Sequence, residues 1–190
     1  MMKVEGSFLL KSGQNELKIL KQMRHPRIVE LLTNYSFNSM IRAEQFNFVL
    51  EYMENGSLRD ILRTYGRKFW KFGQPDLLAL FMDMVVGLKY LHSKGVIHRD
   101  LKPENVLADK LHRLKIADFG VSKITEAAAG ANNHTLVGTS MYMAPEVTSG
   151  LPYDKSCDGE WFSRKLFSIL VRKGSLKIIE MLPWHNVQYE

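Results

Sequence analysis

The stretch His98-Arg-Asp-Leu-Lys-Pro-Glu-Asn105 decides how the rest of this chain is interpreted. It lies between two short apolar runs, 96–97 and 106–107, which predict strands on either side of a polar loop. Functional side chains are concentrated on loops that a rigid scaffold holds in place. The charged and amide side chains of this loop are therefore the first candidates for a catalytic site.

Two further motifs follow it along the chain, Asp118-Phe-Gly120 and Gly138-Thr-Ser-Met-Tyr-Met-Ala-Pro-Glu146. Either one alone would be weak evidence, because a short motif often arises by chance. A long loop motif followed in order by the other two is specific. In these three motifs the chain resembles the eukaryotic protein kinase family, and Lys102 is typical of its Ser/Thr branch.

The resemblance implies a role for each polar residue of the motifs. Asp100 would accept or orient the proton of an acceptor hydroxyl, and Lys102 would reach the transferred phosphate of ATP. Asn105 and Asp118 would hold Mg²⁺, a hard cation that prefers oxygen ligands. From the residues alone, an ordinary role in capping turns stays open for Asp100, Asn105 and Asp118.

Other positions extend the resemblance to a nucleotide site. Leu50-Glu-Tyr-Met53 matches the hinge segment, where Leu50 would be the gatekeeper. The backbone groups of Glu51 and Met53 would meet adenine. Leu107 matches the residue that packs beneath adenine, and Glu16 matches the glutamate of the N-lobe helix.

The activation loop has its own matches. A phosphate on Thr135 would pair with Arg99 and order the loop, which implies an upstream activating kinase. The alternative for Thr135 is a solvated loop threonine. Thr139 matches the threonine at the substrate-binding end of the loop. The family also has a hydrophobic stack that accompanies the active arrangement. The residues that match it are Leu20, Leu31, His98 and Phe119. For the two leucines, plain core packing is the alternative.

Local patterns predict the elements around these motifs. A short helix is expected over 15–23, ended by His25-Pro26, because a residue before proline disfavours helical dihedrals. The aromatic and β-branched run 46–52 predicts a buried strand. Ser57 is expected to cap a short helix that begins at Leu58.

The clearest predicted helix follows Pro75-Asp76, with Asp76 as its N-cap and Gly95 at its C-terminal stop. Further short strands are expected at 96–97, 106–107 and 114–116. The apolar residues of the long helix recur at spacings of four and three and form one stripe: Leu77, Phe81, Met84, Leu88 and Leu91.

The resemblance covers about positions 16–158 and departs from the family pattern at both ends. The family begins with a glycine-rich loop and a strand lysine, and no glycine-rich loop precedes Glu16. Lys3 is either that strand lysine or an exposed N-terminal lysine. After Asp158 the sequence shows no family pattern that we can place.

We therefore expect an α+β, two-lobed protein-kinase-like fold with an incomplete N-lobe sheet and a C-lobe that lacks its last helices. Residues 1–53 would form a partial N-lobe, from the helix to the hinge. Residues 54–158 would form the C-lobe core with the catalytic and activation loops. Residues 159–190 are a divergent C-terminal segment without assignment.

Composition excludes several classes of protein. With 45% hydrophobic and 24% charged residues, the 190-residue chain is neither collagen-like nor disordered. The single cysteine, Cys157, excludes an intramolecular disulfide and favours an intracellular, cytoplasmic protein. We expect no membrane span. The net charge of +6 comes without the basic clusters that nucleic-acid binding would need.

The sequence is compatible with two functions. The first is a Ser/Thr protein kinase, represented by a partial chain, that uses ATP and Mg²⁺ to phosphorylate hydroxyls of a protein substrate. The second is a catalytically inactive, truncated kinase-like protein that acts as a binding or regulatory module. The motifs at 98–105 and 118–120 favour the first function, and the missing glycine-rich loop favours the second.

Overall fold

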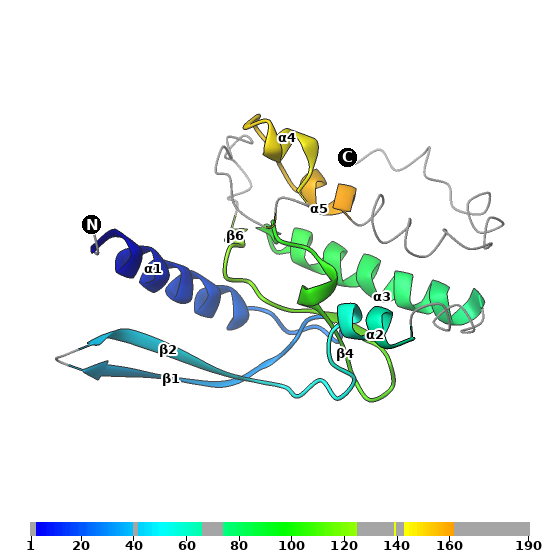
Figure 1. Ribbon diagram of the computed structural model, residues 1–190, viewed down its shortest axis with the longest axis horizontal. Helices are drawn as coiled ribbons and strands as arrows, with labels where there is room; N and C mark the ends of the chain where they lie inside the picture. Colours follow the sequence, from blue (N-terminus) through cyan, green and yellow to red (C-terminus); the bar gives the residue numbers. More distant parts are fainter. Residues whose placement is uncertain (1–2, 40–41, 66–73, 125–138, 140–142, 162–190) are drawn as a thin grey trace.

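The computed structural model describes residues 3–39, 42–65, 74–124, 139 and 143–161, which form a mixed α+β structure. A long helix and a β-hairpin extend to one side of a body built around a second long helix (Figure 1). The helices are α1 (Lys3–Leu20), α2 (Leu58–Tyr65), α3 (Gln74–Ser93), α4 (Pro145–Thr148) and α5 (Ser156–Trp161), with a 3-10 turn η2 at Pro103–Asn105. Among the described residues, none of the helices combines the length and the apolar character needed to span a bilayer.

The strands in these ranges pair as antiparallel two-stranded sheets. The pairs are β1 (Leu31–Ser39) with β2 (Arg42–Leu50), β3 (Val96–Ile97) with β6 (Lys123–Ile124), and β4 (Val106–Ala108) with β5 (Leu114–Ile116). The strands predicted at 96–97, 106–107 and 114–116 are confirmed. Two of them flank the loop 98–105 and hold its ends.

The β1–β2 hairpin corrects the prediction of a buried strand over 46–52. Strand β2 runs from 42 to 50, and its partner β1 was not predicted. Thr33 pairs with Val49 and Tyr35 with Asn47, so these four side chains share one face. Tyr35 is 50% and Val49 39% exposed, whereas Phe48 and Leu50, on the opposite face of β2, pack against the core.

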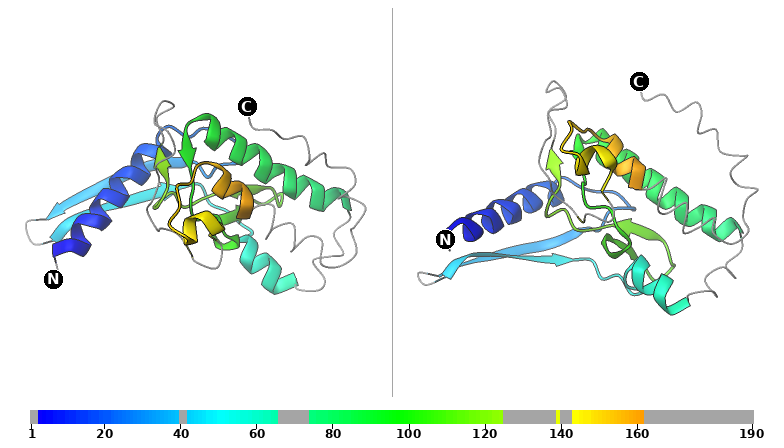
Figure 2. Two further views of the ribbon diagram at one scale, coloured as in Figure 1. Left: turned by 90° about the horizontal axis from the view of Figure 1, so that it is seen from above. Right: turned by 45° about the horizontal axis from the view of Figure 1, so that its top comes forward.

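Helix α1 is longer than the helix predicted over 15–23. It begins at Lys3 and ends at Leu20. Lys3 is therefore a helical residue, and its interpretation as a strand lysine is wrong. Glycines at 6 and 13 weaken the intrinsic helix propensity of this segment. Tertiary packing of α1 along strand β2 offsets that cost (Figure 2).

The core joins α1 to α3 and to the short strands. In α3, the predicted stripe is confirmed at Phe81, Met84, Leu88 and Leu91, all of which are buried. These side chains share one cluster with Ile19 and Leu20 of α1, and with Val106, Ile116 and Phe119. The site motifs at 98–105 and 118–120 therefore border the same core.

The ends of two helices test the predicted caps. The Asp60 N–H donates to Ser57 Oγ at 3.1 Å, which confirms Ser57 as the cap of α2. Gly95 has φ of 68°, a left-handed conformation suited to glycine after a helix, and it confirms the predicted stop. The N-cap prediction for Asp76 is wrong, because α3 already begins at Gln74.

Asp83 of α3 ties three segments together from a buried position. Its carboxylate accepts hydrogen bonds from Arg113 at 2.9 and 2.5 Å, and from the Leu114 N–H at 3.0 Å. Arg27 forms an ion pair with the same group at 3.0 Å, and the Asp83 side chain is only 2% exposed. A Cβ on Gly87, one turn later, would lie 3.1 Å from the Arg27 carbonyl, so glycine permits this close approach.

Replacing Asp83 with Asn should lower the free energy of unfolding by about 3 kcal/mol, measured by urea denaturation. This is the low end for breaking a buried ion pair, because the Arg113 side chain is 44% exposed and keeps part of its hydration. Lys89→Gln, on the exposed face of the same helix, is the control and should change stability by less than about 0.5 kcal/mol. A D83N variant as stable as the parent would refute the anchoring role.

Candidate active site

One buried carboxylate accepts hydrogen bonds from the backbone at the start of the loop 98–105. Asp158 of α5 accepts the His98 N–H through one oxygen and the Arg99 N–H through the other, each at 2.9 Å. His92 Nε2, at the end of α3, lies 2.9 Å from the first of these oxygens. Asp158 is 2% exposed. Sequence reasoning used Asp158 only as a motif boundary and missed this role, because its partners lie about sixty positions away.

Two residues of the site have backbone conformations that side chains usually avoid. Arg99 has φ of 68° and Asp118 has φ of 63°. The left-handed region costs a residue with a Cβ on the order of 1–2 kcal/mol. Such conformations persist only where surrounding contacts hold them. For Arg99, those contacts are the N–H bond to Asp158 and the bond from its Nε to the Val121 carbonyl at 2.7 Å.

The Asp100 carboxylate lies at the centre of a ring of donors. Lys102 Nζ approaches one oxygen at 2.5 Å, and the Asn105 amide donates to the same oxygen at 3.1 Å. The N–H and hydroxyl of Thr139 donate to the other oxygen at 2.7 and 2.8 Å. Lys102 also donates to the Thr139 hydroxyl at 2.8 Å. The structure thus brings Asp100, Lys102, Asn105 and Thr139 together, and the roles that the motifs assign to them stay predictions.

This ring sets the charge of Asp100. Burial alone would raise the pKa of Asp100, but hydrogen bonds from Lys102 and Thr139 and the charge of Lys102 outweigh it. The pKa of Asp100 therefore lies below the ordinary value of an aspartate. The group is an ionised hydrogen-bond acceptor at neutral pH.

Glu16 and Asp118 meet at Gly120. A Cβ built on Gly120 would lie 3.3 Å from Asp118 Oδ1 and 3.7 Å from Glu16 Oε2, so both carboxylates border the same spot. Burial raises the pKa of Glu16, and the negative charge of Asp118 adds to it, whereas a hydrogen bond from the Phe119 N–H acts in the opposite direction. Among the residues whose side chains the structure describes, which in α1 begin at Ser12, no lysine or arginine is a cause of this shift.

The donor chemistry beside Asp100 fits Mg²⁺. The Asn105 amide nitrogen donates to Asp100, to its carbonyl at 2.9 Å and to its carboxylate, so the amide oxygen is the atom suited to a cation. Asp118 offers an exposed carboxylate. The described residues hold no group of three or more His, Cys, Asp or Glu suited to a metal. Two oxygen ligands completed by phosphates and water are typical of Mg²⁺.

The residues predicted to surround adenine form a separate apolar cluster. Met53, Val29 and Ala117 are buried together, with Leu50 and Leu107 packed against them. The Glu51 N–H donates to the Glu30 carbonyl at 3.0 Å, and the Glu51 carboxylate pairs with Lys115 at 2.5 Å. These contacts fix the start of the hinge. The structure therefore brings Leu50, Met53 and Leu107 together, and their contact with adenine stays a prediction.

Of the predicted hydrophobic stack, the structure shows the contact between His98 and Phe119 and places the two leucines at the same core. The His98 and Phe119 rings are 5.3 Å apart between centroids, and both are fully buried. Leu20 shares the core cluster with Phe119, and Leu31 packs against it. The predicted partner of Arg99, Thr135, lies outside the described residues, so their pairing stays a prediction.

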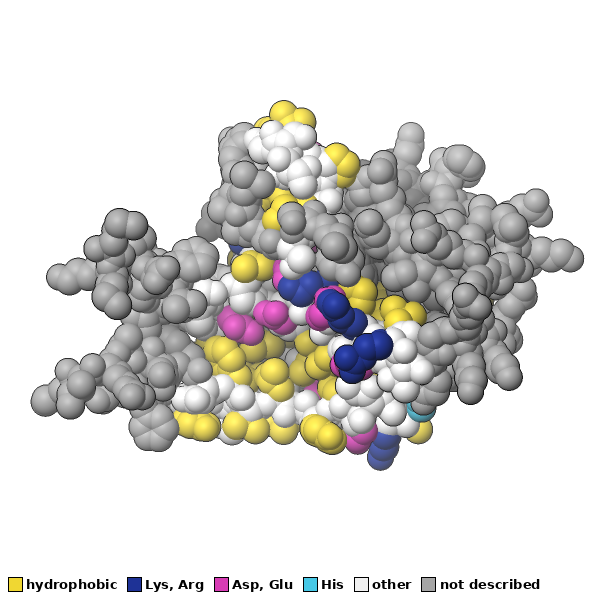
Figure 3. All heavy atoms as spheres, in the orientation of Figure 1, with side chains coloured by type: hydrophobic (Ala, Val, Ile, Leu, Met, Phe, Trp, Pro, Cys, Tyr) yellow, Lys and Arg dark blue, Asp and Glu magenta, His cyan; other side chains and the backbone are white. Residues whose placement is uncertain are grey.

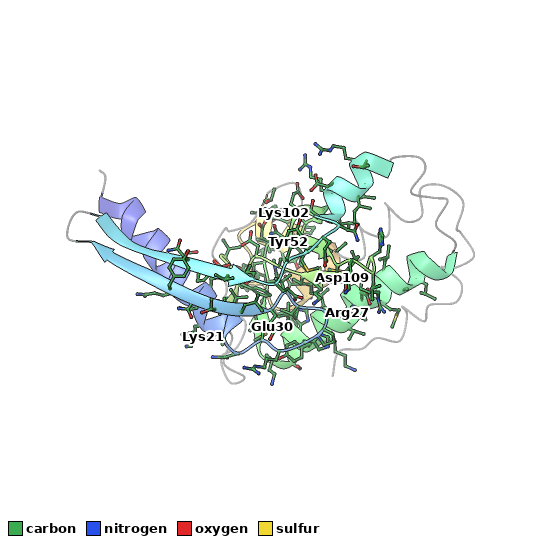
Figure 4. All side chains as sticks on the ribbon, turned by 90° about the horizontal axis from the view of Figure 1, so that it is seen from below. Lys21, Arg27, Glu30, Tyr52, Lys102 and Asp109 are labelled. Carbon is green, nitrogen blue, oxygen red and sulfur yellow. The ribbon has the colours of Figure 1, made fainter. Side chains whose placement is uncertain are left out.

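Charged side chains form a band on one face of the molecule. Acidic and basic side chains run together above a patch of hydrophobic ones (Figure 3). Lys102 and Tyr52, labelled in Figure 4, belong to the catalytic loop and the hinge. Charged groups thus lie next to an apolar surface on this face.

Comparison with known proteins identifies the family. The model of the protein kinase domain matches residues 3–170, so the chain belongs to the protein kinase family. The match reaches further at both ends than the positions 16–158 that the motifs covered.

The relatives include serine/threonine kinases. The chain is 33% identical over 157 residues to the probable serine/threonine-protein kinase KCC4 of Saccharomyces cerevisiae, covering 83% of this chain and 14% of that protein. It is 35% identical over 170 residues to CBL-interacting protein kinase 26 of Oryza sativa subsp. japonica, covering 89% and 32%. It is 42% identical over 134 residues to cytokinesis protein sepH of Aspergillus niger, covering 70% and 9%. The chain thus spans less than a third of the length of these relatives.

Replacing Asp158 with Asn should loosen the catalytic loop. The asparagine side chain has one oxygen to accept a hydrogen bond where the aspartate has two. At least one of the His98 and Arg99 N–H groups therefore loses its partner. We expect a loss of about 1–3 kcal/mol of stability and faster hydrogen exchange at these two amides. Asp154→Asn, which keeps an acceptor for the Ser156 N–H, is the control. Unchanged exchange at His98 and Arg99 would contradict the role of Asp158.

Proposed function

We propose that this chain carries the catalytic centre of a Ser/Thr protein kinase that transfers the γ-phosphate of ATP to serine and threonine hydroxyls. The observation that carries the proposal is the ring around Asp100. In it, an ammonium group and a magnesium-suited amide each lie within hydrogen-bonding distance of one ionised carboxylate. Phosphoryl transfer depends on positioning and charge neutralisation, and this ring supplies groups for both.

Asp100 would orient the acceptor hydroxyl. A carboxylate with a lowered pKa is a weak base, so its main contribution is to accept a hydrogen bond from the hydroxyl and align its oxygen. Lys102, held between Asp100 and Thr139, would stabilise negative charge on the transferred phosphoryl group. Release of Lys102 from one of these contacts would accompany substrate entry.

Asn105 and Asp118 would hold Mg²⁺, which neutralises phosphate charge when it is bound. Leu50, Met53 and Leu107 would enclose adenine, with backbone groups of Glu51 and Met53 as its hydrogen-bond partners. Protein substrates follow from the same proposal. Thr135 would accept a regulatory phosphate from an upstream kinase and pair with Arg99.

A second function is favoured by one observation. Burial and the negative charge of Asp118 raise the pKa of Glu16, and no lysine or arginine whose side chain the structure describes is among the causes. A protonated Glu16 would not form the ion pair that fixes a lysine at the ATP phosphates. The alternative proposal is a catalytically inactive kinase-like protein that acts as a binding or regulatory module.

Turnover with Mg-ATP and a generic basic protein separates the two functions. Under the first, the parent chain transfers phosphate, and Asp100→Asn lowers kcat by about 10²–10⁴-fold because the hydroxyl is no longer oriented. A thermal shift with Mg-ATP should remain in this variant, since Asp100 contributes little to nucleotide binding. Asp118→Ala should abolish both turnover and the magnesium-dependent part of the shift.

Asp109→Asn is the matched control for these variants. Asp109, labelled in Figure 4, lies in the β4–β5 turn, and an asparagine there still offers an oxygen to the Leu111 and Arg113 N–H groups. It should leave turnover unchanged. No turnover by the parent chain, even with a thermal shift, would refute the kinase proposal and support the binding module.

A further inference from the structure

The turn at residues 119–122, directly after Asp118, needs partners from outside itself. The Ser122 N–H donates to the Phe119 carbonyl at 3.0 Å, which closes the turn. The carbonyls of Gly120, Val121 and Ser122 accept hydrogen bonds from side chains outside the turn. Backbone carbonyls at a packed site are costly without such partners. Arg99 supplies one of them, to Val121 at 2.7 Å.

Helix α1 supplies the other two donors. The Ser12 hydroxyl donates to the Gly120 carbonyl at 2.5 Å. The Asn15 amide donates to the Ser122 carbonyl at 2.8 Å. Both contacts join residues more than a hundred positions apart. The turn is therefore held from two sides, by α1 and by the catalytic loop.

The spacing on α1 puts these groups on one face. Ser12, Asn15 and Glu16 stand at positions i, i+3 and i+4, which are neighbours on a helix surface. Glu16 accepts from the Phe119 N–H on the same turn. Ser12 and Asn15 lie outside every motif of the family resemblance, so only the structure reveals their contacts.

The backbone conformation at the start of the turn explains why these hydrogen bonds are needed. Asp118, its preceding residue, has φ of 63°, a conformation that a side chain avoids unless contacts hold it. Gly120 N–H donates to Asp118 Oδ1 at 3.2 Å, which couples the carboxylate to the turn. A displacement of the turn would therefore move the Asp118 carboxylate.

We propose that Ser12 and Asn15 are positioning residues that hold the turn 119–122, and with it the Asp118 carboxylate, in the arrangement that binds Mg²⁺. The inference deepens the proposed kinase function and rests on it for the identity of the cation. Under this proposal, α1 would position the Mg²⁺ ligand Asp118 through hydrogen bonds to main-chain carbonyls. These hydrogen bonds involve no lysine.

Hydrogen exchange without ligand tests the contact itself. In the double variant Ser12→Ala with Asn15→Ala, the Phe119 and Ser122 amides should exchange about twofold to tenfold faster for each lost bond. Alanine is a better helix former than serine or asparagine. Faster exchange therefore cannot come from a weaker intrinsic helix.

Two controls belong to this measurement. Gln14→Ala, on an exposed position of α1, should leave exchange at 119–122 unchanged. Ser12→Thr keeps the hydroxyl and, combined with native Asn15, should keep the parent's slow exchange. Unchanged exchange in the double variant overturns the proposal. An equal rise in the β4–β5 segment 106–116 also overturns it, since that would mean a general loss of folding.

Magnesium dependence tests the consequence. A fluorescent ADP analogue is titrated with Mg²⁺, and the double variant should need severalfold more Mg²⁺ for half-maximal binding, with metal-free nucleotide affinity unchanged. The same Mg²⁺ requirement in both proteins overturns the proposal. If the parent binds no nucleotide at all, the kinase proposal fails, and the proposed metal-positioning role fails with it. The exchange experiment then still shows whether Ser12 and Asn15 hold the turn.

Discussion

Two oxygens of one buried carboxylate, on Asp158 of α5, accept the backbone N–H groups of His98 and Arg99. This contact keeps Arg99 in its left-handed conformation, and Asp100 follows directly in the chain. Because Asp158 is 2% exposed, water does not compete strongly for these bonds. The position of the whole donor ring around Asp100 therefore depends on an aspartate that lies outside the ring.

The same principle recurs across the site. Arg99 donates to the Val121 carbonyl, Ser12 to Gly120 and Asn15 to Ser122, so side chains from two distant segments satisfy one short turn. Main-chain groups that regular structure cannot pair must find such partners. The loops that carry Asp100 and Asp118 are held here by hydrogen bonds to their backbone groups.

Local sequence patterns predicted much of this protein. The apolar periodicity of α3 and the short strands were predicted correctly. The motifs named Asp100, Lys102, Asn105 and Asp118, whose roles stay predictions. Strand β1 and the first twelve residues of α1 were missed, because packing between the helix and the hairpin overrides weak local propensity. Asp83 was missed because its charge is paired with arginines far along the chain.

The sequence by itself determined which side chains are candidates for the site and that they stand on loops next to short strands. Only the tertiary structure decided their partners: Thr139 reaches Asp100 across 39 positions, and Asp158 reaches His98 across 60. Those partners set the ionisation of Asp100 and the backbone conformation of Arg99. The physical reason is that hydrogen bonding and burial depend on distance in space, and local spacing in the sequence does not encode that distance.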